Sequence, residues 1–403
     1  MPLHIATLFE LGPDDAGSIG GGVELHAYNL SKELARRGHK ITYITGAIPD
    51  NEEKKQLEGI DIQRLDFCSL IRRAYDPQQL KFLRQLFFLT KTAIKSINSK
   101  EWEDFDIFHG HIYSSGLAAY LLGKKRSARI INTIHGSYYK HWKHLTKNRF
   151  VAGLYRSMER RLAPLLTKIC HYQIHTDYEF ANLVRSWSKP KFHDKILTVL
   201  NGVDTKKFNS NVKPNEKLID EKGPIIMTTR RLVVKNGVLF LIKAFKKIIE
   251  EFPTSKLIII GDGPEKLTIQ REVQNLNLES NIELIGMLPN SIIPSYLSAA
   301  DVVVVPSIVE ASSISVLEAM AMRKPVVASD IPGIREISNY GKNCVLVPSM
   351  NPAEIANGTL EILQSNEKAE EIAKNGNEEI LQHYSWEKKA EEIEQIYLRA
   401  LEK

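Results

Sequence analysis

The sequence predicts an α/β protein with two parallel-sheet domains. Strand-like apolar runs alternate with stretches whose apolar residues recur at helical spacing, as in 4–11, 23–37 and 40–47, and this alternation favours parallel strands joined by helices. The chain of 403 residues is too long for one ordinary core and suits two domains of roughly 200 residues each. Ligands of such sheets bind outside the carboxyl ends of the strands.

A change in the sequence near residue 200 marks the domain boundary. A polar stretch with a proline, 188–195, precedes an expected strand that ends in an Asn-Gly turn at 201–202. We therefore expect a first domain over 1–198 and a second over 199–384, with a last amphipathic helix, 385–403, that packs back on the first domain. The other expected elements are helices 78–98 and 237–252 and strands 105–111, 128–136, 224–232, 256–260, 282–285, 301–305 and 325–329.

Composition indicates a soluble globular protein of the cytoplasm. The chain is 43% apolar and 25% charged, and its apolar runs fall short of the roughly 20 residues that span a bilayer. Its first residues carry no basic segment or cleavage site, so we expect no signal peptide. Three scattered cysteines, Cys68, Cys170 and Cys344, fit neither a disulfide framework nor a zinc knuckle, which favours a reducing compartment.

The positive charge is concentrated in the first half. Residues 1–200 hold 30 Lys and Arg against 20 Asp and Glu, a net charge of +10, whereas the remainder holds 24 against 28. Such a half could face anionic lipid, a phosphorylated acceptor or nucleic acid, or it could be a solvated surface with no partner. No nucleic-acid-binding motif accompanies the charge, and we expect no nucleic-acid partner.

The segment 306–322 holds the strongest candidate site. The buried strand 302–305 leads into a loop of small residues, and Ser312 and Ser313 signal the start of a helix. Backbone N–H groups and the positive helix end there favour a diphosphate. Glu318, in the second helical turn, could accept hydrogen bonds from both hydroxyls of a ribose, and Glu310 could face a sugar. Alternatively, either glutamate only caps or decorates the helix.

Cations follow the strand that opens the second domain. Arg231 and Lys235 come just after this strand and could neutralise a leaving nucleoside diphosphate without a metal. Arg230 could do this instead, or it could be a surface residue. The choice between Arg230 and Arg231 stays open at this point.

Two glycine-rich loops are weaker candidates. Gly20, Gly21 and Gly22 follow the first strand and open a helix, which lets the backbone approach a phosphate closely. Because the spacing is not that of a dinucleotide site, we expect the loop to touch a donor sugar or its β-phosphate. The second loop, 261–264, begins at Gly261 and is first of all a turn between strand and helix.

Three histidines, His109, His111 and His135, follow strand-like runs. The H-x-H spacing of the first two places both rings on one side of an extended segment, as in some metal sites. No Cys, Asp or Glu completes such a site locally, so we expect no metal. One imidazole bonded to a sugar hydroxyl fits better, and His109 fits a buried histidine with satisfied hydrogen bonds.

Residues 137–150 mix aromatic with basic side chains after a strand. Such a segment could stack on a sugar or rest on anionic headgroups, and it could equally be an ordinary polar helix.

Ten pieces of sequence carry a resemblance along nearly the whole chain. They are GGVELHAYNLSKELARRGH, FDIFHGHIYSSGLAA, LNGVDTKKF, RRLVVKNGV, KLIIIGDGPEK, IELIGMLP, ADVVVVPS, EASSISVLEAMAM, KPVVASDIPGIREI and YSWEKKAEEIEQIY. Together they resemble a family 4 glycosyltransferase of the GT-B fold, in which two Rossmann-like domains face each other across a cleft. The E-x7-E spacing of Glu310 and Glu318, between a strand ending in Pro-Ser and LEAMA, is the most specific single feature.

The resemblance implies a role for each matching position. Glu310 would contact donor-sugar hydroxyls and Glu318 the ribose diol, while His111 would bind the sugar near the reacting carbon. Backbone N–H groups of Ala311, Ser312, Ser313 and Ile314 would meet the diphosphate, together with Arg231 and Lys235. Gly21 and Gly22 would approach the β-phosphate or sugar, Gly261 lies among the donor-side loops, and Met287 and Leu288 would meet the base.

Three positions depart from the family pattern. Arg230 stands where a small residue is usual, Asn236 stands where a lysine commonly precedes the glycine, and Ala311 replaces a frequent glycine. Lys235, one position earlier, would therefore have to reach the phosphates.

The resemblance also implies the reaction. It is transfer of a hexosyl unit from a UDP-, GDP- or ADP-linked sugar to a glycan, lipid-linked or small-molecule acceptor. The family retains anomeric configuration and requires neither metal nor cofactor. We expect a cytoplasmic enzyme with peripheral contact to anionic membrane through its basic half. The alternatives are a catalytically inactive GT-B module that binds a glycan or partner, and a sugar-nucleotide epimerase.

Overall fold

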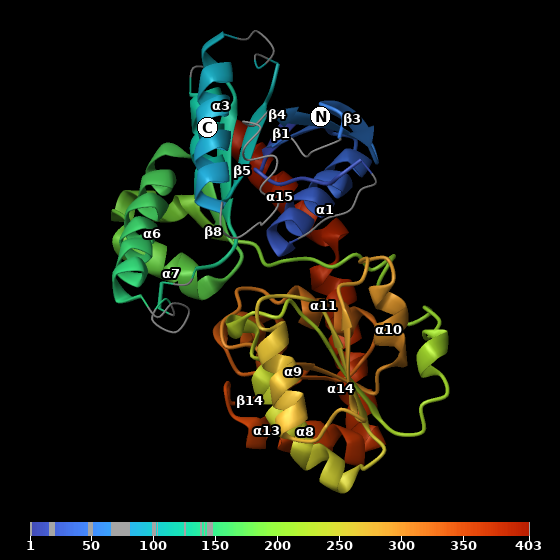
Figure 1. The fold of residues 1–403 in the computed structure, drawn as a ribbon. Coiled ribbons are helices and arrows are strands. Elements are labelled where there is room, and N and C mark those ends of the chain that lie inside the picture. Colours follow the sequence, from blue (N-terminus) through green and yellow to red (C-terminus); the bar gives the residue numbers. More distant parts are fainter. Residues whose placement is uncertain are drawn as a thin grey trace. The chain divides into compact units, whose positions relative to one another are not determined.

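The computed structural model (Figure 1) describes residues 2–15, 21–46, 51–65, 81–98, 102, 104–124, 126–137, 139–140, 142 and 148–402. The chain divides into two compact units. The first comprises Met1–Trp142, Asn148–Leu200 and Trp386–Lys403, and the second comprises Asn201–Ser385. The expected boundaries lay at 198 and 385.

The first unit is built on a largely parallel sheet. Its strand order is β3-β4-β2-β1-β5-β6-β7-β8, and every pair except β3–β4 is parallel. The strands are β1 (His4–Leu8), β2 (Lys40–Gly46), β3 (Lys54–Leu57), β4 (Ile60–Leu65), β5 (Ile107–His111), β6 (Arg129–Ile134), β7 (Tyr172–His175) and β8 (Ile196–Thr198). The antiparallel β3–β4 hairpin was not predicted, because β3 is a short polar segment, KKQL, without apolar alternation.

Helices cover both faces of this sheet. They are α1 (Gly22–Arg36), α3 (Lys81–Asn98), α4 (Ile112–Gly123), α6 (Arg149–Ile169), α7 (Tyr178–Trp187) and α15 (Trp386–Leu401). One core joins the sheet to α1 and α15 through Ile5, Leu34 and Ile393, so the last helix packs beside α1, as Figure 1 shows. A second core on the other face holds Phe88, Leu122 and Phe180.

The second unit has a fully parallel sheet in the order β11-β10-β9-β12-β13-β14. The strands are β9 (Ile225–Thr229), β10 (Lys256–Ile260), β11 (Ile282–Gly286), β12 (Val302–Val305), β13 (Val326–Ser329) and β14 (Val345–Val347). The helices are α8 (Val238–Glu251), α9 (Lys266–Asn275), α10 (Ile293–Ala299), α11 (Ile314–Ala321), α12 (Pro332–Ile337), α13 (Pro352–Gln364) and α14 (Asn366–Glu379). The predicted α/β class with parallel sheets is confirmed.

In each sheet, the order in which successive strands are added reverses once, at the first strand of that sheet in the chain. β1 lies between β2 and β5, and β9 lies between β10 and β12. At such a switch point the connections leave on opposite faces, and the carboxyl ends of the two strands open a crevice that is the usual ligand site of α/β sheets. The switch points therefore direct attention to the loops after β1 and β5 and after β9 and β12.

Within the described part of the chain, no helix combines the length and apolar character needed to cross a membrane.

Candidate functional site

Arg230 and Glu310 meet at the switch point of the second unit. Arg230 is the first residue after β9, and Glu310 lies in the loop that joins β12 to α11. The Arg230 guanidinium donates to the Glu310 carboxylate, to Asn236 Oδ1 at 3.1 Å and to Ser313 Oγ at 3.4 Å. Only 8% of Arg230 is exposed. This arginine therefore ties together the ends of two strands and the start of α11.

Glu310 is held as a carboxylate by its neighbours. Burial alone would raise its pKa, but the positive charges of Arg230 and Lys235 and the hydrogen bonds from Arg230 and Ser307 outweigh it and keep the pKa below its ordinary value. Ser307 Oγ donates to Glu310 Oε2 at 3.3 Å. An ionised carboxylate at this place is an acceptor for hydroxyl donors such as those of a sugar.

Glu318 has the opposite electrostatic character. It lies in the second turn of α11 and is buried, and this burial raises its pKa to about 7 against the partial compensation of Lys207, Asn290 and Arg230. Lys207 also donates to the side chain of Asn290. Lys207 and Asn290 were not among the residues that the sequence pattern indicated for this group. Lys207 lies within the LNGVDTKKF piece, which was a usable signal, whereas Asn290 gave none.

The amino end of α11 is anchored but not capped by its own residues. The N-cap, Ser313, is extended and its side chain makes no capping hydrogen bond to the helix. Asn201 holds the loop in place, since its backbone N–H donates to Ser312 Oγ at 3.1 Å and its Nδ2 to the Ser312 carbonyl at 2.7 Å. Ser315 Oγ donates to the carbonyl of Thr229 at 2.8 Å. The N–H groups of this first turn can therefore bind an external anion.

Two glycines allow close backbone contacts, one with this loop and one with Arg230. A Cβ atom on Gly333, in α12, would lie 1.5 Å from the carbonyl oxygen of Ala311. A Cβ atom on Gly261 would lie 1.9 Å from the Arg230 carbonyl oxygen, and Gly261 has a φ of +145°. Gly261 thus supports the Arg230 backbone.

The other predicted donor-side residues are more exposed than Arg230. Arg231 is exposed and Lys235 is half-buried, so of the two adjacent arginines it is Arg230 that enters the buried cluster. Met287 follows β11 and is 65% exposed, and Leu288 is half-buried. One exposed and one half-buried apolar side chain beside a strand end can pack against a flat ring such as a nucleobase.

In the first unit, Gly21 and His111 lie at the corresponding switch point. Gly21 is the extended N-cap of α1 and Gly22 its first helical residue, with no side chain capping the helix. Gly20 lies outside the described residues. His111 ends β5 and caps α4, and Ile112 after it has a φ of +68°. A β-branched residue with positive φ is a strained conformation that occurs mostly at functional sites.

Asn132 supports this strained turn. With its amide nitrogen turned toward the turn, it donates to the carbonyls of Gly110 and Ile112, each at 2.9 Å. Asn132 is fully buried in β6. The position of His111 is therefore set by the sheet rather than by a free loop.

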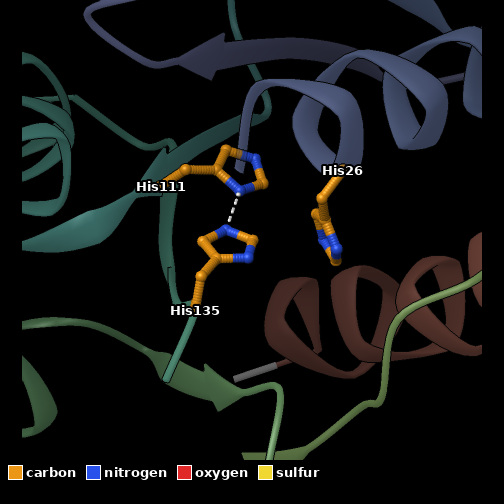
Figure 2. A group of neighbouring side chains, drawn as sticks. All are labelled: His26, His111 and His135. Atoms are coloured by element: carbon orange, nitrogen blue, oxygen red, sulfur yellow. Dashed lines mark hydrogen bonds between the residues drawn. The ribbon is translucent and has the colours of Figure 1, made fainter. Parts of the chain in front are cut away.

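Three histidine side chains from three elements face one another beside this turn (Figure 2). His26 comes from α1, His111 from the end of β5 and His135 from the residue after β6. Nδ1 of His111 is hydrogen-bonded to Nε2 of His135 at 3.0 Å, while Nε2 of His111 is buried without a hydrogen-bond partner among the described residues. We call His26, His111 and His135 the histidine triad. His26 was not among the sequence candidates.

His109 is separate from this triad in its bonding. Its Nδ1 bonds to the Tyr397 hydroxyl at 2.6 Å and its Nε2 to Thr133 Oγ1 at 2.7 Å. Burial lowers the pKa of His109 to about 3. It is a buried histidine with both ring nitrogens bonded, and its ring stacks on that of His111 with 4.4 Å between centroids.

Two aromatic side chains of the segment 137–150, Tyr139 and Trp142, pack onto neighbouring helices. Trp142 stacks on Tyr155 of α6 with 4.4 Å between ring centroids, and its Nε1 donates to Glu159 at 2.8 Å. Tyr139 lies 4.7 Å from the ring of Trp187 at the end of α7. Residues 138, 141 and 143–147 lie outside the described residues, as does Cys68.

Known proteins resemble this chain in sequence and in fold. Residues 20–207 match the family "Glycosyltransferase Family 4" and residues 209–379 match "Glycosyl transferases group 1". An uncharacterized glycosyltransferase of Methanocaldococcus jannaschii is 25% identical and aligns over 95% of this chain and 96% of its own. The N-acetyl-alpha-D-glucosaminyl L-malate synthase of Bacillus anthracis is 25% identical over 94% of both chains. The solved sucrose-phosphate synthase of Thermosynechococcus elongatus shares the fold, with a TM-score of 0.81, 22% identity and 98% coverage of both chains.

Proposed function

Because this chain belongs to the family 4 glycosyltransferases of the GT-B fold, we propose that it transfers a hexosyl unit from a nucleoside-diphosphate sugar to an acceptor hydroxyl. The observation that carries the proposal is the group of Arg230, Glu310 and the uncapped start of α11 at the switch point of the second sheet. A cation, a carboxylate and the N–H groups of an uncapped helix start thus lie where α/β sheets bind ligands.

The diphosphate is bound at the amino end of α11. Backbone N–H groups of residues 311–314 and the positive helix end favour its negative charge. Arg230 adds a guanidinium, and Arg231 and Lys235 lie beside it at greater exposure. These cations stabilise the departing nucleoside diphosphate, so the transfer needs no metal ion. Gly21 and Gly22, at the start of α1 where no side chain caps the helix, are proposed to contact the β-phosphate or the sugar.

The sugar and the ribose take different carboxylates. Glu310 is ionised and accepts from sugar hydroxyls, and Glu318 accepts from the two ribose hydroxyls once it is ionised. His111, whose pKa burial lowers well below its ordinary value, is neutral and is proposed to bind the sugar near its anomeric carbon. The bond from that carbon to the diphosphate breaks as the acceptor oxygen bonds on the same face, and the hydroxyl proton passes to the departing phosphate, with retention of configuration.

We further propose that the acceptor side works at an anionic membrane surface. Helix α6 exposes Arg149, Arg156, Arg160, Arg161 and Lys168 together with apolar side chains. The apolar ones are Phe150, Leu154 and Leu165, which are 80%, 52% and 41% exposed. A helix face that combines basic and large apolar side chains fits the headgroup region of anionic lipid. The two described cysteines, Cys170 and Cys344, are free thiols, which supports a cytoplasmic location.

A donor screen tests the proposal. The purified chain is incubated with UDP-, GDP- and ADP-linked hexoses without acceptor, and release of nucleoside diphosphate is measured. We expect slow hydrolysis of one class and its loss in Glu310→Gln. Glu250→Gln, an exposed glutamate on α8, serves as control. Binding of a nucleotide sugar without any release would instead favour an inactive GT-B module, and conversion of the free sugar nucleotide into its epimer would favour an epimerase.

A further inference from the structure

We propose that the histidine triad, His26, His111 and His135, is a binding site for one transition-metal ion, of which Zn²⁺ fits best. The ion would be inhibitory rather than catalytic, and this second part rests on the proposed function because it concerns the role of His111. The binding itself stands on the geometry of the triad alone.

The three imidazoles already lie close to the spacing that a metal ion needs. One ring nitrogen from each histidine lies within 4.8 Å of the others. His111 Nδ1 and His135 Nε2 are 3.0 Å apart, and two ligand nitrogens of a tetrahedral Zn²⁺ site are about 3.3 Å apart given the usual Zn–N bond of about 2.0–2.1 Å. The other two nitrogen–nitrogen distances, both to His26, are at most 4.8 Å, and a rotation of the His26 side chain would shorten them. Figure 2 shows the three rings converging on one space.

The donor set selects the type of ion. Three neutral imidazoles suit Zn²⁺, Cu²⁺, Ni²⁺ and Co²⁺, whereas Mg²⁺ and Ca²⁺ prefer oxygen ligands. The triad contains no carboxylate. Three histidines leave the fourth position of a tetrahedral ion open to water or a ligand.

The surroundings of the triad orient two of the rings. His109 stacks on His111, and both of its ring nitrogens are hydrogen-bonded, to Tyr397 and Thr133. It therefore packs against the His111 ring and does not serve as a metal ligand. The indole of Trp386 meets the His26 ring edge to face, with 5.0 Å between centroids. His26 and His111 are buried but His135 is half-buried, and an ion could enter past His135.

Occupancy by an ion has a consequence for the reaction. His111 is the residue proposed to bind the donor sugar, and a metal bonded to its Nδ1 would replace the hydrogen bond to His135 that now orients the ring. Metal binding and sugar binding would then require different orientations of the His111 ring, so each would disfavour the other. We therefore expect Zn²⁺ to slow transfer and a chelator to restore it.

Direct binding to the chelator-treated full chain is the primary test. The protein is dialysed against EDTA and titrated with Zn²⁺ in competition with a chromophoric chelator, and Co²⁺ is added in parallel to record its visible spectrum. We expect one Zn²⁺ per chain, a tetrahedral Co²⁺ spectrum, and no competition by millimolar Mg²⁺ or Ca²⁺. Absence of stoichiometric Zn²⁺ binding would overturn the site whatever the enzyme assay shows.

Variants locate the ion. His135→Asn and His26→Asn should each weaken Zn²⁺ binding about tenfold or more, since loss even of a supporting residue costs 10–100-fold. His383→Asn removes an exposed histidine of the second unit and should leave binding unchanged. Thermal melting checks that each variant is folded, and His135→Asn, at a half-buried position, is the safer of the two. Equal Zn²⁺ affinity in folded His135→Asn and His383→Asn would refute the assignment. Zn²⁺ binding with unchanged donor hydrolysis would refute only the inhibitory role.

Discussion

Arg230 donates to the carboxylate of Glu310, so the cation that follows β9 and the carboxylate that follows β12 neutralise each other at the ends of adjacent strands. Both side chains are largely withdrawn from water. Removing one partner would leave the other as an uncompensated charge in a poorly solvated place.

Arg230→Met should therefore destabilise the chain by about 3 kcal/mol and abolish nucleotide-sugar binding. Urea unfolding and isothermal titration measure the two effects. The double variant Arg230→Met with Glu310→Gln should recover most of the stability but none of the binding, because the charge is gone while the donor contacts remain absent. If Arg230→Met alone were as stable as the wild type, the ion pair would not contribute to the free energy of unfolding. Arg231→Met, at the exposed neighbouring position, is the matched control for stability.

The raised pKa of Glu318 predicts a pH dependence of nucleotide binding. Its pKa of about 7 means that the carboxylate needed to accept from the ribose hydroxyls is largely protonated at pH 6 and largely ionised at pH 8. Affinity for the nucleoside diphosphate should rise about tenfold over that interval. The Glu318→Gln variant should bind weakly at both pH values. Because the nucleotide titrates in the same way with both proteins, the difference between the wild-type and variant pH profiles reports on Glu318 alone. Parallel profiles would contradict the assignment of Glu318 to the ribose.

The same carboxyl predicts an opposite trend for stability. Its folded pKa of about 7 lies above the ordinary value of 4.5, so the folded state prefers the protonated form. This stabilising contribution, of roughly 3 kcal/mol, is fully present below pH 4.5 and is lost as pH rises through 7. Glu318→Gln should consequently be more stable than the wild type at pH 8 and no more stable at pH 4.5. Urea unfolding at the two pH values checks this, and equal pH dependence of both proteins would count against the buried carboxyl.

Gly333→Ala should disable the donor loop without unfolding the sheet. The added methyl group would meet the Ala311 carbonyl at 1.5 Å, so the loop between β12 and α11 must move and carry the N–H groups of residues 311–314 with it. We expect at least a tenfold loss in donor affinity. Gly153→Ala, in α6 with no atom within 4 Å of its Cβ, should leave affinity unchanged and add up to about 1 kcal/mol of stability. Full donor affinity in Gly333→Ala would show that the loop position is not needed.

The basic face of α6 predicts salt-sensitive binding to anionic vesicles. Arg160→Glu with Arg161→Glu reverses two exposed charges and should reduce co-sedimentation with phosphatidylglycerol vesicles severalfold, since each basic residue near such a surface contributes about 1 kcal/mol. Wild-type binding should fall as salt rises. Lys374→Glu with Lys388→Glu, at exposed positions of α14 and α15, is the control. Equal binding to neutral phosphatidylcholine vesicles would argue against an electrostatic membrane contact.

The sequence alone was sufficient for the class of fold and for the positions of Glu310 and Glu318 relative to α11. Helix and strand periodicity located β10 over 256–260 and α8 within a residue at each end, because long periodic segments depend on local spacing. The E-x7-E spacing placed one glutamate in the loop before α11 and the other in its second turn. Both relationships join residues that are close together in the sequence, so local backbone geometry determines them.

The tertiary structure decided what depends on contacts between distant segments. Both faces of β9 are covered, as Ile226 and Met227 are equally buried, so apolar alternation could not reveal whether Arg230 or Arg231 points inward; packing against Glu310, 80 residues away, does so. In the same way His26 joins His111 and His135 only because α1, β5 and β6 meet at one edge of the sheet. A sequence records which residues are present, but their meeting across such separations follows from strand order and packing, which no local spacing encodes.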